Sequence, residues 1–142
     1  MTPNMVAALR IVSEAEGLLE RANADTASLW PRMASLLGRQ AIEIAMSEFW
    51  LLRAPGAQNA NWRGQFLSLP SYFGNRRLAL EAFHAWSSLS GACHYDSYEL
   101  SPSAIDLRNW LEVVREFAEN VARQTDGTPS TAPRGSASPD KP

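Results

Sequence analysis

The sequence has little cysteine, a single lysine and no long apolar run. Cys93 is the only cysteine among the 142 residues. One cysteine cannot form an internal disulfide or build a cysteine-rich zinc site. No apolar stretch approaches the roughly 20 residues that a membrane-spanning helix needs, and the start lacks the basic segment and unbroken apolar run of a signal peptide. We therefore expect a cytoplasmic protein that has no membrane contact.

Positive charge comes almost entirely from arginine, which supplies 12 of the 13 basic residues. The formal net charge is −2, so no global basic field attracts nucleic acid, although a local basic site is not excluded. A guanidinium suits bidentate contacts to phosphate or carboxylate better than an ammonium does. A coding bias towards alanine and arginine explains the same skew.

The end of the chain differs in composition from the rest. Residues 124–142 are rich in Pro, Ser, Thr and Gly and contain no Leu, Ile, Val or aromatic residue. Such a segment cannot bury enough apolar surface to offset the entropy lost on ordering. We predict a disordered tail over 124–142 and one folded domain over 1–123, a size typical of a single domain.

Apolar residues recur at helical spacing in four long segments, and no strand-like alternation occurs. The first and last segments begin at Thr2-Pro3 and Ser101-Pro102, each an N-cap residue followed by a first-turn proline. A short amphipathic piece, residues 61–70, separates the second and third long segments, 26–53 and 76–93. We predict an all-α fold, an antiparallel four-helix bundle with one short additional helix. The predicted core face of 26–53 carries Trp30, Met33, Leu37, Ala41, Ile44 and Leu51.

Two histidines and the cysteine are the first candidates for chemistry. Glu81 and His84 have the Glu-x-x-His spacing of di-iron bundles, but no second such unit exists, so we predict no metal. Cys93 continues an apolar stripe, and we expect a buried, inert thiol. His94 ends a predicted helix, where free carbonyls favour a cation. Its side chain either stabilises the C-terminus of that helix or acts as an acid–base group on a phosphodiester.

Other polar groups leave similar alternatives open. Arg39 and Glu43 lie one turn apart, as a surface ion pair or inside the polar end of the bundle. Tyr95 and Tyr98 either stack on a base or cover the bundle end. Arg76 and Arg77 are either phosphate contacts or an ordinary charged helix start. Asp96 either lines the site or pairs with an Arg or caps a turn. Some of Trp50, Trp62 and Trp86 are candidates for an isologous dimer face.

Two segments carry a family resemblance. "SLLGRQAIEIAMSEFW", residues 35–50, is similar to the second helix of HEPN domains, and "LSGACHYDSYELSPSAIDLRNWLEVVREFAENV", residues 89–121, resembles their ending. The resemblance covers about residues 5–123. HEPN domains are four- or five-helix bundles, commonly dimeric, and many are metal-independent ribonucleases of toxin–antitoxin, CRISPR and other antiviral systems. It therefore implies RNA, a second copy and a cognate protein as partners, and no cofactor.

The family's ribonuclease motif maps only in part. Its His corresponds to His94, but no Arg occurs between Arg77 and Arg108, and Ser90 stands where the motif Arg is expected. A serine cannot replace a cation that stabilises phosphate charge. The resemblance implies His94 as the acid–base residue. In place of the motif Arg, we expect Arg39 of the second helix, or an Arg of a dimer partner, to supply the charge, with Glu43 orienting Arg39. The implied RNA contacts are Ser90, Tyr95, Asp96, Tyr98, Arg76 and Arg77. The alternative is a non-catalytic HEPN-like bundle that dimerises or binds a protein partner.

Overall fold

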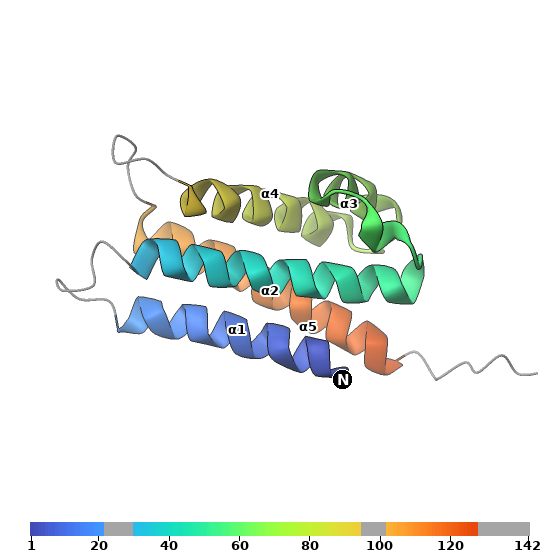
Figure 1. Cartoon of the computed structure of the whole chain (residues 1–142), viewed down its shortest axis with the longest axis horizontal. Coiled ribbons are helices and arrows are strands. Elements are labelled where there is room, and N and C mark those ends of the chain that lie inside the picture. Colours follow the sequence, from blue (N-terminus) through green and yellow to red (C-terminus); the bar gives the residue numbers. More distant parts are fainter. Residues whose placement is uncertain (22–29, 95–101, 128–142) are drawn as a thin grey trace, which may run out of the picture.

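The computed structural model describes residues 1–21, 30–94 and 102–127 (Figure 1). These contain five α-helices and no strand, which confirms the prediction of an all-α chain. None of the helices is both long and apolar enough to span a membrane in the part of the chain described. The helices are α1 Pro3–Glu20, α2 Trp30–Arg53, α3 Trp62–Ser68, α4 Arg76–Cys93 and α5 Ala104–Gly127, with two 3-10 turns, η2 Ala57–Asn59 and η3 Leu69–Ser71.

The four long helices lie side by side, and α3 covers the beginning of α4 (Figure 1). Polar contacts between helices show how neighbouring helices are oriented relative to one another. Asn4, near the start of α1, donates to the carboxylate of Glu48, near the end of α2, at 2.6 Å. Arg77, at the start of α4, reaches Glu116 in the second half of α5 at 2.9 Å. The first contact shows that α1 and α2 run in opposite directions, and the second places the start of α4 beside the middle of α5.

The ends of the helices are set by capping side chains. Thr2 Oγ1 accepts a hydrogen bond from Met5 N at 3.2 Å, as the sequence predicts for α1. The predicted start of α5 is wrong, because the helix begins at Ala104. Ser103 Oγ accepts from Asp106 N at 3.1 Å, and Ser103 N donates to Asp106 Oδ2 at 3.4 Å. This reciprocal cap satisfies two backbone donors, which places the helix start after Pro102.

The last helix also extends past the predicted end of the domain. Helix α5 continues to Gly127, so residues 124–127 are helical, contrary to their assignment to a disordered tail. Gln124 Nε2 donates to Asn120 Oδ1 at 2.6 Å, and Thr125 Oγ1 donates to Ala122 O at 2.8 Å. These local hydrogen bonds, and an ion pair between the Met1 amino group and Asp126, hold polar residues in the last turn. Residues 128–142 lie outside the described part.

The prediction for the core face of α2 is right only in part, since Ala41 is buried and Trp30, Leu37 and Ile44 pack against the core. Met33 and Leu51 are 51% and 50% exposed, which corrects their assignment to the core. The buried face instead combines small residues with large ones, because small side chains let the neighbouring helices approach closely. Its members are Ala34, Ser35, Gly38, Ala41, Ile42, Ala45, Met46, Phe49 and Trp50.

The aromatic residues are mostly used inside the molecule. Trp50 is 1% exposed and packs edge-on against Phe49, with ring centroids 5.0 Å apart. Trp62 and Trp86 are half-buried and pack against the core, and Trp86 stacks on Phe66 at 5.0 Å. Trp50 is therefore excluded from the predicted dimer face, because its ring is already covered within the chain.

Candidate functional site

A polar cluster lies between α2 and α4 and consists of Arg39, Glu43, Trp86 and Cys93. Arg39 Nε donates to Glu43 Oε1 at 2.8 Å, and their side chains are 30% and 17% exposed. Trp86 Nε1 donates to the same carboxylate oxygen at 3.4 Å. The Arg39–Glu43 pair is therefore half-buried beside α4, which favours the interpretation as part of a polar site over a simple surface ion pair.

Cys93 meets this cluster from the last turn of α4. The thiol is half-buried and is not part of the hydrophobic core, which corrects the expectation of a fully buried core residue. Burial raises the pKa of the Cys93 thiol, and the Arg39 guanidinium partly opposes this through its charge and a hydrogen bond. The pKa of Arg39 is itself raised, chiefly by its hydrogen bond to Glu43. A raised pKa favours the protonated thiol, which is the less nucleophilic form.

His94 is the residue that caps the C-terminus of α4. Its side chain is exposed, and its backbone N–H donates to Gly91 O at 3.1 Å. Because His94 directly follows Cys93, which Arg39 contacts, the imidazole and the guanidinium belong to the same end of the α2–α4 seam. The predicted position of His94 at a solvent-exposed helix end is confirmed.

The other proposed RNA contacts differ in whether their side chains are exposed and in whether the structure describes them. Ser90 Oγ is buried and has no hydrogen-bond partner among the described residues, so it offers no surface group to RNA. Arg76 is exposed at the start of α4. Tyr95, Asp96 and Tyr98 lie outside the described residues, and their roles stay predictions.

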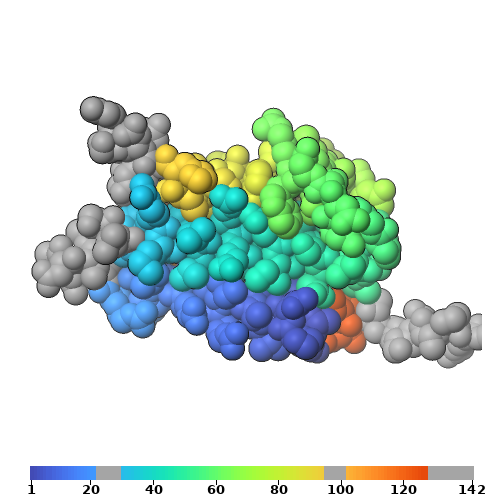
Figure 2. Space-filling view, in the orientation of Figure 1, coloured from blue at the N-terminus to red at the C-terminus, as the bar shows by residue number. Residues whose placement is uncertain are grey.

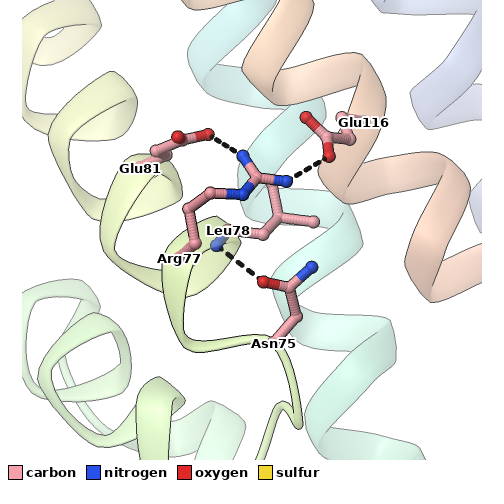
Figure 3. A network of polar contacts seen from close by, with 5 residues as sticks. All are labelled: Asn75, Arg77, Leu78, Glu81 and Glu116. Atoms are coloured by element: carbon pink, nitrogen blue, oxygen red, sulfur yellow. Dashed lines mark hydrogen bonds and ion pairs between the residues drawn. The ribbon is translucent and has the colours of Figure 1, made fainter.

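Arg77 has two carboxylate partners (Figure 3). Its Nη1 pairs with Glu81 Oε2 at 2.7 Å, within α4, and its Nη2 pairs with Glu116 Oε1 at 2.9 Å, on α5. The side chain remains 58% exposed, so water screens both pairs. Two adjacent anions leave little net positive potential for a phosphate. The structure therefore favours the interpretation of Arg77 as a surface link between two helices.

The described residues contain no group of three side chains that could hold a metal ion. Glu81, one half of the Glu-x-x-His unit, is paired with Arg77, and His84 is exposed. His84 instead borders an open groove of about 460 Å³ between α4 and α5, which Leu80 and Trp110 also line.

Two shallow hollows follow the outer face of α2. One, of about 370 Å³, lies where α2 meets Asn4 of α1 and Trp62, and the other, of about 270 Å³, lies beside Arg39. Gln40 and Glu43 border both hollows. Figure 2 shows this face, with α2 between α1 on one side and α3 and α4 on the other.

Comparisons with models of known families, with curated proteins and with solved structures find no match to this chain. Sequence reasoning identified Arg39, Glu43 and His94 but missed Trp86 and Cys93 as their neighbours. Trp86 and Cys93 are seven residues apart and so share a face of α4. The sequence already placed both on one apolar stripe, but only helix packing brings this face to Arg39.

Proposed function

We propose that the chain is a HEPN-like antiparallel bundle that binds RNA and cleaves it without a metal, as in defence or toxin–antitoxin systems. The place of the Arg39–Glu43 ion pair carries this proposal: Trp86 of α4 donates to the same carboxylate, and His94 ends that helix. The α4 sequence has no arginine within the usual distance of His94, and α2 supplies a permanent cation at the same helix end. Glu43 holds Nε of that guanidinium, which orients the remaining N–H groups.

The chemistry follows the roles of these two side chains. His94 takes the proton from a ribose 2′-hydroxyl, whose oxygen then attacks the adjacent phosphorus. The bond to the 5′-oxygen of the next nucleotide breaks, and that oxygen leaves with a proton from water or from the protonated imidazole. The products are a 2′,3′-cyclic phosphate and a 5′-hydroxyl. Arg39 stabilises the extra negative charge on the phosphoryl oxygens during the displacement.

An RNA-cleavage assay with a chelator present tests this function. We expect wild-type protein to cleave, and His94→Ala to slow cleavage by about 100-fold or more, the usual effect of removing an acid–base group. Arg39→Met should cost about 100-fold or more, since it removes the stabilising charge. His84→Ala is the matched histidine control on the same helix, and Arg115→Met is the matched arginine control.

Arg115 suits this purpose because it is also half-buried and paired with carboxylates, Glu16 and Glu119, but lies on α5. Cleavage by none of the proteins would remove the nuclease proposal. Equal cleavage by wild type and His94→Ala would place the reaction elsewhere in the molecule.

A non-catalytic HEPN-like interaction module is the second candidate. Two observations favour it, namely the two carboxylates that neutralise Arg77 and the buried hydroxyl of Ser90 in place of a motif arginine. Both reduce the positive surface that RNA could contact. This candidate predicts that wild-type protein neither cleaves nor binds RNA, measured by fluorescence anisotropy at low salt.

A further inference from the structure

A small hollow lies where the end of α2 meets η2 and α3, and we call it the Trp50–Gln65 hollow. Its volume is about 120 Å³, and it is lined by three alanines and by Trp50, Gly64, Gln65, Ser68 and Tyr72. None of the described residues that line it carries a charge. The end of α2 and α3 lie at the same end of the molecule (Figure 1).

Two buried polar atoms of this lining have no hydrogen-bond partner among the described residues. Trp50 Nε1 is a donor, and Trp50 is 1% exposed. Gln65 Oε1 is an acceptor, and Gln65 is 3% exposed. Burying a donor or an acceptor without a partner costs free energy, so such groups are nearly always hydrogen-bonded in folded proteins. Here one donor and one acceptor belong to the lining of the same hollow.

The orientation of the Gln65 amide is fixed by its nitrogen. Nε2 donates to Gln58 O at 3.1 Å and to Ala60 O at 2.7 Å. Carbonyl oxygens only accept hydrogen bonds, so the flipped amide would place Oε1 against two other acceptors. Oε1 is therefore the end of the amide that lacks a partner, and a group that binds it has to donate.

The lining selects the kind of group that satisfies both atoms. A carboxylate or a ketone accepts from Trp50 but has no hydrogen to donate to Gln65, and an ammonium group donates but cannot accept. An ion would also be buried without a countercharge in the lining. A primary carboxamide has a carbonyl oxygen and an N–H₂ group side by side, so it supplies both partners.

A hydroxyl group is the other neutral group that both accepts and donates. It does so through a single oxygen, as a water molecule does, and therefore gains little over the water that it displaces. The hollow is larger than one water needs, about 10–15 Å³, and smaller than the roughly 300–1,000 Å³ of pockets for drug-sized ligands. Its size therefore suits a molecule of a few to about ten heavy atoms.

We propose that the Trp50–Gln65 hollow binds a small uncharged molecule through a primary carboxamide. The carbonyl oxygen accepts from Trp50 Nε1, and the N–H₂ group donates to Gln65 Oε1. The apolar body of the ligand lies against the alanines, and Tyr72, which is 46% exposed, connects the lining with the surface. This inference goes beyond the proposed nuclease, because Trp50 is about 16 Å along α2 from Arg39 and no residue of that site takes part.

The indole N–H of Trp50 provides the test. In isotope-labelled protein each indole gives its own NMR signal, and the signal that disappears in Trp50→Phe belongs to Trp50. We expect benzamide to shift this signal and to leave that of Trp110 unchanged, since Trp110 lines the groove between α4 and α5. Acetophenone has nearly the same shape without the N–H₂ group, and benzoate replaces that group by a charged oxygen. Both should bind about 10-fold more weakly or not at all, because Gln65 Oε1 then lacks a donor.

A variant that fills the hollow locates the binding. Ala57→Leu adds a larger side chain to the lining and changes neither hydrogen-bonding residue, so it should abolish the shift caused by benzamide. Ala104→Leu, at the start of α5, is the matched control because both alanines are half-buried, and it should bind as wild type does. An unchanged shift in Ala57→Leu overturns the proposal. The ligand series uses unmodified protein, so it decides the question if the filled variant does not fold.

Three outcomes of the ligand series contradict the proposal. The first is no shift with benzamide or with propionamide, which carries the same group on a smaller body, because the hollow then holds water only. The second is equal affinity for benzamide and acetophenone, which shows an apolar hollow that does not use Gln65. The third is tighter binding of benzyl alcohol than of benzamide, which makes a hydroxyl the preferred group. Benzamide binding by a protein that does not cleave RNA supports this site and removes only the nuclease.

Discussion

Gly38 of α2 lies directly against Leu111 of α5. A Cβ atom at position 38 would stand 2.7 Å from Leu111 Cδ2 and 3.2 Å from Leu89 Cδ1. Both leucines are completely buried, so neither methyl group can move into solvent. The missing side chain of Gly38 therefore allows α2, α4 and α5 to meet at one level of the core.

Gly38→Ala should destabilise the protein, although alanine favours helix more than glycine does. The added methyl group overpacks the contact with Leu111, which costs about 1–3 kcal/mol in a dense core. Gly91→Ala is the matched control, because it is also helical and has no atom within 4 Å of its Cβ position. That variant should be more stable than wild type by up to about 1 kcal/mol. Urea unfolding measures both, and equal effects would contradict the close contact at position 38.

Removing Arg39 should raise the pKa of Cys93 further. Burial already raises that pKa, and the charge and hydrogen bond of Arg39 lower it. Arg39→Met removes only the opposing influence, so the thiolate forms at higher pH than in wild type. The pH at which the rate of iodoacetamide alkylation of Cys93 is half-maximal measures this pKa. A change in the accessibility of the thiol that scales the rate equally at every pH leaves this midpoint unchanged. Arg115→Met, whose pairs lie with Glu16 and Glu119, should leave the midpoint unchanged. A lower midpoint in Arg39→Met would show that Arg39 does not stabilise the thiolate.

Gln65 should hold the segment between α2 and α3 in place. Its side chain is 3% exposed, and Nε2 donates to Gln58 O at 3.1 Å and to Ala60 O at 2.7 Å. Gln65→Met keeps a similar shape but leaves both carbonyls without this donor, which should cost about 1–2 kcal/mol. The loss should be local, so hydrogen exchange should rise in residues 57–61 and stay constant in α5.

The exposed Gln40→Met is the control for the Gln65 experiment, because it removes the same group from a solvated position. Its stability should match that of wild type within about 0.5 kcal/mol. Faster exchange throughout the molecule in Gln65→Met would indicate that the side chain supports the whole core rather than this segment.

The sequence determined the features that depend on neighbouring residues in the chain. Thr2-Pro3 specified the start of α1, and helical spacing over residues 76–93 gave the bounds of α4 as the structure has them. Arg39 and Glu43 were correctly placed one turn apart, and His94 was correctly placed at a helix end. Caps, periodicity and pairs one turn apart act within a few residues, so they can be recognised without the rest of the fold.

The tertiary structure decided which of two apolar faces of α2 is buried. Met33 and Leu51 have helical spacing as regular as that of the core residues, and hydrophobicity alone favoured them. The face with Gly38 is buried instead, because the absence of a side chain at that position lets α2 lie against Leu89 and Leu111. The meeting of Arg39 with Cys93 was decided in the same way, since residues on separate helices become neighbours only when the helices pack.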